Sequence, residues 1–172
     1  RAADLRVWGQ AVARSEQGAL PGTRQTAHLL HGVSDILTRD LIIVSTWSGQ
    51  VGVCLPLTVH LARVAPAGWV APAAGWVAPA AGLLAWFAYA DGRGALAAAA
   101  AVRALDDDPS HRLAALVQLA VRQALPPALL ERVVDAAAAD LAARIDPTGP
   151  LGGWQRRLAA RQDPLPDDPS LG

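Results

Sequence analysis

Two histidines and an aspartate are the first side chains that could take part in chemistry. His28, His31 and Asp35 stand three and then four positions apart. On a regular helix they share one face, and imidazole and carboxylate groups are zinc ligands. All three would come from a single helix with no further ligand elsewhere, so we expect a solvated or hydrogen-bonded surface and no metal. His60 and His111 stand alone, and we expect them to be structural or exposed.

A cysteine, an acidic run and a pair of glycines are the other candidates. Cys54 could be a nucleophile with His60, but a gap of six matches no activation pattern, and cysteine is often a small buried apolar residue. The aspartates 106–108 could bind a divalent cation, but they precede a proline where a helix should end. No strand is expected before Gly92 and Gly94, although a phosphate-binding loop would follow one, so these glycines indicate a turn. We therefore expect no catalytic residue and no cofactor.

Basic residues near the end of the sequence could contact nucleic acid or a membrane. Arg156, Arg157 and Arg161 lie close to Trp154, and we expect this segment to be a solvated tail. The whole chain has a formal net charge of zero and a pI near 7.1. The chain has no net positive charge that would attract a polyanion, so we do not expect a nucleic-acid partner.

The composition indicates a bacterial source with GC-rich coding. All 15 basic residues are arginine, 13 of the 15 acidic residues are aspartate, and lysine, asparagine and methionine are absent.

Without a methionine, the sequence is expected to be a piece of a longer protein. One cysteine excludes an internal disulfide, and residues 1–17 show no apolar signal-peptide core. We expect a cytoplasmic location.

Apolar residues recur at helical spacing along most of the chain. The β-branched run 41–44 could be a short strand, but no second strand pairs with it, and we favour a buried helix. We expect an all-α fold of about six helices, a single domain over residues 1–147, and a flexible, mostly disordered tail over 148–172. The expected helices cover 4–17, a span from Thr23 or Thr26 through Val44, 56–64, 79–90, 95–107, 111–125 and 128–145.

A perfect tandem repeat interrupts this helical pattern. Gly-Trp-Val-Ala-Pro-Ala-Ala occurs at 68–74 and again at 75–81. Because each copy carries a proline, the repeat cannot continue as a coiled-coil heptad. We interpret it as a duplicated loop, since lengthening a loop costs little closure entropy. The functional alternative is a loop that grips a partner protein through Trp69 and Trp76.

Residues 79–107 predict two helices joined by a glycine turn. Gly92, Ala97, Ala104 and Pro109 follow one another at intervals of five, seven and five. This pattern resembles a tetratricopeptide unit, in which these positions are the turn glycine, two close-packing alanines and the stop proline. A free-standing array needs about three such units, so we expect one hairpin inside a larger helical domain.

A wider resemblance rests on six short segments: Arg39-Asp40, Leu61-Ala62-Arg63-Val64-Ala65-Pro66, Leu83-Leu84-Ala85-Trp86, Gly92-Arg93-Gly94-Ala95-Leu96-Ala97, Arg103-Ala104-Leu105-Asp106-Asp107-Asp108-Pro109 and Leu125-Pro126-Pro127. Together they resemble the C-terminal half of an actinobacterial family of unknown function, the one numbered 4192, over about residues 35 to 130. The resemblance implies that an N-terminal portion of the family is missing here. It implies one copy of the Gly-Trp-Val-Ala-Pro segment where this chain has two, and it brings no catalytic residues.

Three functions remain open from the sequence. The first, which we favour, is a non-enzymatic helical module that binds an unknown protein or its own missing N-terminal portion. The second is the C-terminal part of an enzyme whose active site lies in that portion. The third is a membrane-associated hairpin, because the stretches 41–62 and 64–90 carry no charged residue. Prolines and glycines interrupt both stretches, so we do not expect a membrane partner.

Overall fold

The computed structural model describes residues 1–46, 51–66, 75–146 and 148–160. Its helices, in chain order, are α1 (Ala2–Glu16), α2 (Thr23–Ser34), α3 (Ile36–Thr46), the short 3-10 helix η1 (Gly52–Cys54), α4 (Leu55–Val64), α5 (Val77–Ala90), α6 (Gly94–Asp107), α7 (Arg112–Arg122), α8 (Ala128–Arg144) and α9 (Gly152–Ala160). No strand is present in the described part of the chain. The predicted all-α fold class is confirmed, with more helices than the expected six.

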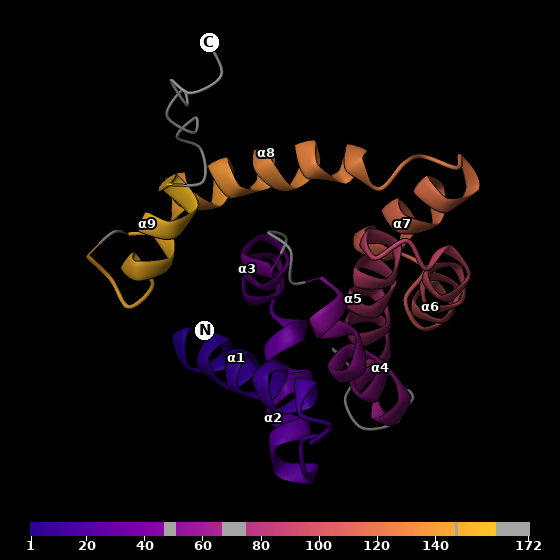
Figure 1. Cartoon of the computed structure of the whole chain (residues 1–172), viewed down its shortest axis with the longest axis horizontal. Coiled ribbons are helices and arrows are strands. Elements are labelled where there is room, and N and C mark those ends of the chain that lie inside the picture. Colours follow the sequence, from indigo (N-terminus) through magenta and orange to yellow (C-terminus); the bar gives the residue numbers. More distant parts are fainter. Residues whose placement is uncertain (47–50, 67–74, 147, 161–172) are drawn as a thin grey trace, which may run out of the picture.

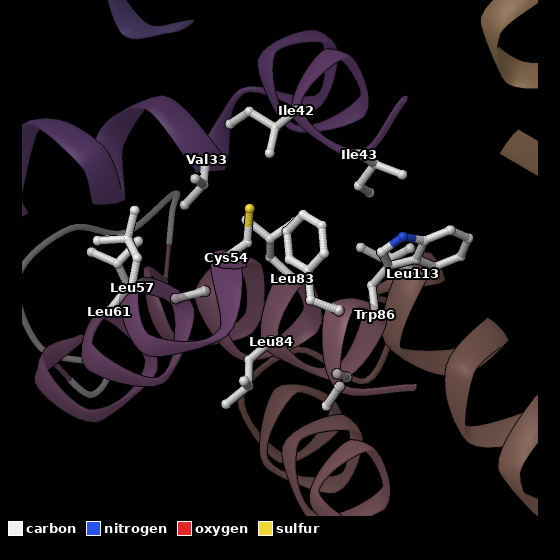
Figure 2. Packing of buried hydrophobic residues seen from close by; sticks show 14 of the residues in the cluster. Val33, Ile42, Ile43, Cys54, Leu57, Leu61, Leu83, Leu84, Trp86 and Leu113 are labelled. Carbon is white, nitrogen blue, oxygen red and sulfur yellow. The ribbon is translucent and has the colours of Figure 1, made fainter. Parts of the chain in front are cut away.

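Helix α5 forms the centre of the molecule. Nearly all of its side chains are buried, and α2, α4, α6 and α7 pack around it (Figure 1). Phe87 of α5 stacks on Trp8 of α1, with ring centroids 6.5 Å apart and an angle of 19° between the planes. Figure 2 shows how Trp86 of α5 lies near Ile43 of α3 and Leu113 of α7. One apolar core therefore joins helices from both halves of the sequence.

Helices α5 and α6 form a close-packed hairpin. Gly92 lies in the turn with φ at +76°, a conformation that side chains bearing a Cβ rarely adopt. Ala97, Ala101 and Ala104 of α6 are fully buried, as expected for small residues that let two helices approach closely. The helical hairpin is thus confirmed, while its likeness to a tetratricopeptide unit stays a prediction.

The helix expected to run from residue 23 to 44 is broken at Asp35. Asp35 adopts an extended conformation, with φ at −77° and ψ at 119°, between α2 and α3. Its carboxylate accepts hydrogen bonds from the backbone N–H of Thr38 at 2.9 Å and from the Thr38 hydroxyl at 3.0 Å. Aspartate is a preferred N-cap because it satisfies such free N–H groups. The favoured helix over 41–44 is confirmed, as part of α3.

The interpretation of the repeat as a duplicated loop is wrong for residues 77–81, because α5 begins two residues before the expected start at residue 79. Val77 to Ala81 form the start of α5. Pro79 is the third residue of this helix, where a backbone N–H has no intrahelical partner and its absence costs nothing. Residues 67–74, which contain the first copy, lie outside the described residues.

The segment 148–172, expected to be a tail, begins with an additional helix. Helix α9 packs on α8, and its Trp154 lies half-buried against the core. The glycines and prolines that flank this helix explain the expectation, because a short amphipathic stretch between such residues has little intrinsic helical stability. Residues 161–172 lie outside the described residues.

The start of α7 lies close against α5 at Gly82. A Cβ atom on Gly82 would lie 2.3 Å from Cε1 and 2.9 Å from Nδ1 of His111. His111 is buried and held at the start of α7, so its ring has little freedom to move away. Gly9, on the exposed face of α1, offers a contrast, because nothing lies within 4 Å of a Cβ added there.

We predict that Gly82→Ala and Gly9→Ala shift stability in opposite directions. Alanine improves helix propensity by about 1 kcal/mol at both positions. At Gly82 the methyl group forces the His111 ring out of its site, and we expect a net loss of about 1–3 kcal/mol. Urea denaturation at neutral pH measures both variants. A Gly82→Ala variant as stable as the Gly9→Ala variant would contradict the close approach of α5 and α7.

Candidate functional site

His28 and His31 lie on α2, whereas Asp35 lies in the break between α2 and α3. His28 Nε2 lies 3.0 Å from Asp4 Oδ1, and His31 is exposed. Asp35 accepts two hydrogen bonds of 3.1 Å from the Arg1 guanidinium. These bonds, together with those from Thr38, hold the pKa of Asp35 at about 2, against the opposing effect of burial. Among the described residues, no group of three histidines, cysteines or acids could hold a metal ion.

Cys54 lies fully buried in the apolar core. Figure 2 shows its sulfur pointing toward Val33 and Ile42. Burial raises the pKa of the Cys54 thiol to about 12, and the charge of Glu16 adds to this effect. His60 Nε2 lies 3.3 Å from the hydroxyl of Thr26. The thiol therefore stays protonated at neutral pH and is a poor nucleophile.

The acidic run at the end of α6 has a structural role that the sequence does not reveal. The backbone N–H of Ala78 donates a 2.9 Å hydrogen bond to Asp107 Oδ2, so Asp107 caps the N-terminus of α5. The positive end of the α5 dipole stabilises this carboxylate. A Cβ added at Gly75 would lie 2.5 Å from the same oxygen, so the carboxylate also packs closely against Gly75.

The remaining residues of this region form turns. Asp108 Oδ1 accepts hydrogen bonds from the backbone N–H of Ser110 at 2.9 Å and from its hydroxyl at 2.7 Å. These bonds lower the pKa of Asp108. Gly92 lies in the turn before α6 and Gly94 is its first residue, and Arg93 pairs with Asp91 beside them at 2.7 Å. The predicted turn at Gly92 and the predicted helix end before Pro109 are confirmed.

His111 has a structural role, one of the two outcomes expected for it, because it is buried at the start of α7. Its Nδ1 accepts a 3.3 Å hydrogen bond from the backbone N–H of Ala114 and so caps α7. Burial lowers the pKa of His111, the charge of Arg39 lowers it further, and Asp108 and Asp107 oppose the shift. In the sequence, His111 follows Asp108 by three residues and directly precedes an apolar periodic stretch. This position is the only signal that could have indicated its role as the N-cap of α7.

The two tryptophans considered for partner contact and the arginines expected in a solvated tail lie partly outside the described residues. Trp76 precedes α5 and is half-buried against the core, and Trp69 lies outside the described residues. Arg156 of α9 is exposed. Arg161 also lies outside the described residues.

Large aliphatic side chains are exposed mainly in one stretch of the chain. Six of the nine large exposed apolar residues in the described ranges lie between α6 and the first half of α8. They are Val102, Leu116, Leu119, Leu125, Leu129 and Val133. On α7, Leu119 lies on the exposed face, and Leu116, one turn earlier, lies where this face borders the buried residues. No described helix is long and apolar enough to cross a membrane.

We predict that Asp107→Ala destabilises the fold and that Asp106→Ala does not. Both changes remove one carboxylate, but only Asp107 caps α5. Loss of such a cap costs about 1 kcal/mol, whereas the exposed Asp106 should change the free energy of unfolding by less than about 0.5 kcal/mol. Equal effects of the two variants in urea denaturation would show that the cap contributes nothing.

We also predict a loss of stability on mild acidification that depends on His111. Its pKa in the folded state is lowered from the ordinary 6.5, so its contribution is full above pH 6.5 and is lost as the pH falls below that value. His111→Asn keeps a capping side chain but does not titrate, and should flatten the curve of unfolding free energy between pH 7 and 5. His31→Asn, an exposed control, should leave that curve unchanged. An identical slope for His111→Asn and the unmodified chain would contradict this role.

Comparison with known proteins identifies a family but no characterised relative. No curated protein and no solved structure shows a significant match to the chain. The family model described as a domain of unknown function (DUF4192) matches residues 1–128. This match starts at residue 1 and ends at the first residue of α8. The six short segments that resemble the family begin only at residue 39. Because the model covers well over half of the chain, the protein belongs to the DUF4192 family.

Proposed function

We propose that this domain is a non-enzymatic interaction module that binds a partner protein through the exposed face of α7. The observation that carries the proposal is the pair Leu116 and Leu119, which are 38% and 54% exposed on one face of this helix. Single exposed leucines are common on protein surfaces, but two on adjacent turns form an apolar stripe. A stripe of this kind suits an amphipathic helix from a partner.

The charges around this stripe indicate the chemistry of the partner. Arg112 lies one turn before Leu116, and Arg122 lies one turn after Leu119. Both arginines are exposed, and α7 contains no acidic residue. The complementary surface is therefore an apolar helix face flanked by aspartate or glutamate, because opposite charges at the rim direct the approach and select the partner.

The side chains with reactive potential support a binding role over catalysis in the described part of the chain. Cys54 is buried with a raised pKa, Asp107 and His111 cap helices, and Asp35 caps α3 while it pairs with Arg1. Each group is thus engaged in holding the fold. We therefore propose a scaffold that presents an apolar surface and performs no chemistry with these residues.

Capture from an extract of the source cells tests this proposal. We expect the tagged chain and its Ala13→Glu variant to retain the same partner, and Leu119→Glu to lose at least about tenfold of the bound amount, which corresponds to about 1.4 kcal/mol. Ala13 is an exposed residue of α1, away from the proposed surface, and receives the same new charge, so it controls for charge and folding. Retention of the partner by Leu119→Glu, or equal loss by both variants, would contradict the proposal.

A further inference from the structure

Helix α3 is buried around most of its circumference. Leu41, Ile42, Ile43 and Val44 are consecutive, and each is at most 6% exposed. Successive helical residues are about 100° apart, so four of them cover about 300° around the axis. Packing against a single neighbour cannot bury all four. Figure 2 shows Ile42 and Ile43 directed toward the core, which leaves another side of α3 for a different partner.

Helix α8 covers that other side of α3. The two helices pack together, and Figure 1 shows α8 lying along one edge of the molecule, from α7 past α3 to α9. One face of α8 is buried and apolar, whereas its exposed positions carry charges such as the Asp140–Arg144 pair. The buried side chains recur at intervals of four, four, three and four: Leu130, Val134, Ala138, Leu141 and Ile145. Helix α8 thus binds α3 as an amphipathic helix binds a groove.

The α8–α9 pair is attached to the rest of the described chain chiefly through α3. Helix α9 packs on α8, and α8 packs on α9 and α3. Pro126 and Pro127 separate this pair from α7, and proline ends a helix and limits pairing of the adjacent backbone. The family match ends at residue 128, where α8 begins. The matched part therefore contains α3 but not the helix that covers it.

We propose that the outer side of α3 is a docking site for an amphipathic helix, which α8 occupies within the same chain and can vacate together with α9. The partner that fits the vacated site is a helix with the α8 pattern: apolar residues at intervals of four, four, three and four, with a small residue in the middle and charges on the opposite face. This inference does not depend on the binding role of α7, which lies on a different helix.

A pair of neighbouring valines provides the test. Val134 is 1% exposed and faces the core, and Val133 is 45% exposed. Val134→Asp in the full chain places a charge in the contact with α3, whereas Val133→Asp adds the same charge to the exposed side. The probe is a fluorescent synthetic peptide of residues 126–146. We expect Val134→Asp to bind it at least tenfold more tightly than the unmodified chain or the Val133→Asp variant does.

Three results would overturn the proposal. The first is a Val134→Asp chain that binds the peptide no better than the Val133→Asp chain. The second is binding that persists when the peptide itself carries Val134→Asp, since this would show non-specific adhesion. The third is loss of cooperative unfolding in the Val134→Asp chain, because α8 would then be an inseparable part of the core.

Hydrogen exchange on the unmodified chain gives a second test that needs no variant. If α8 and α9 leave α3 as a unit, their amides should exchange together and at least tenfold faster than those of the central helix α5. Protection of α8 equal to that of α5 would mean that the helix leaves only on global unfolding, and this would overturn the proposal.

Discussion

The burial of α5 is the constraint on which the rest of the structure depends. A helix with apolar side chains on all sides is stable in water only when neighbours surround it, and α2, α4, α6 and α7 do so. The small residues of α5 and α6 allow close approach, and Gly82 lets the ring of His111 pass where a methyl group would collide. Large residues fill the remaining space, with Trp86 and Phe87 fully buried at the centre.

Most of the fold could be predicted from the sequence because helical spacing and stop signals are local. The turn at Gly92, the buried Ala97 and the helix end before Pro109 all follow from residues within one or two turns. The predicted helix boundaries are wrong where one residue can serve two structural roles. Asp35 fits the preceding helix by its spacing but caps the next one, and α5 begins two residues before Pro79, the start that the sequence predicts.

The roles of the polar side chains were harder to predict because their partners are distant in the sequence. Asp107 caps a helix that begins thirty residues earlier, and His28 meets Asp4 from another helix. No spacing rule connects such residues before the fold is known. Once placed, these groups satisfy backbone N–H groups or pair with charges, which removes the reason to read them as ligands or catalysts. The apolar surfaces on α3 and α7 then become the features that distinguish this domain.

The cap of Asp107 on α5 also bears on how the chain reaches its folded state. It joins the end of the α5–α6 hairpin to its beginning, so contacts among residues 77–107 close a loop of only about thirty residues. Contacts of α1 with α4, or of α3 with α8, must close much longer loops at a greater cost in chain entropy. Low contact order favours rapid formation, and we therefore expect the hairpin to form before the outer helices pack on it.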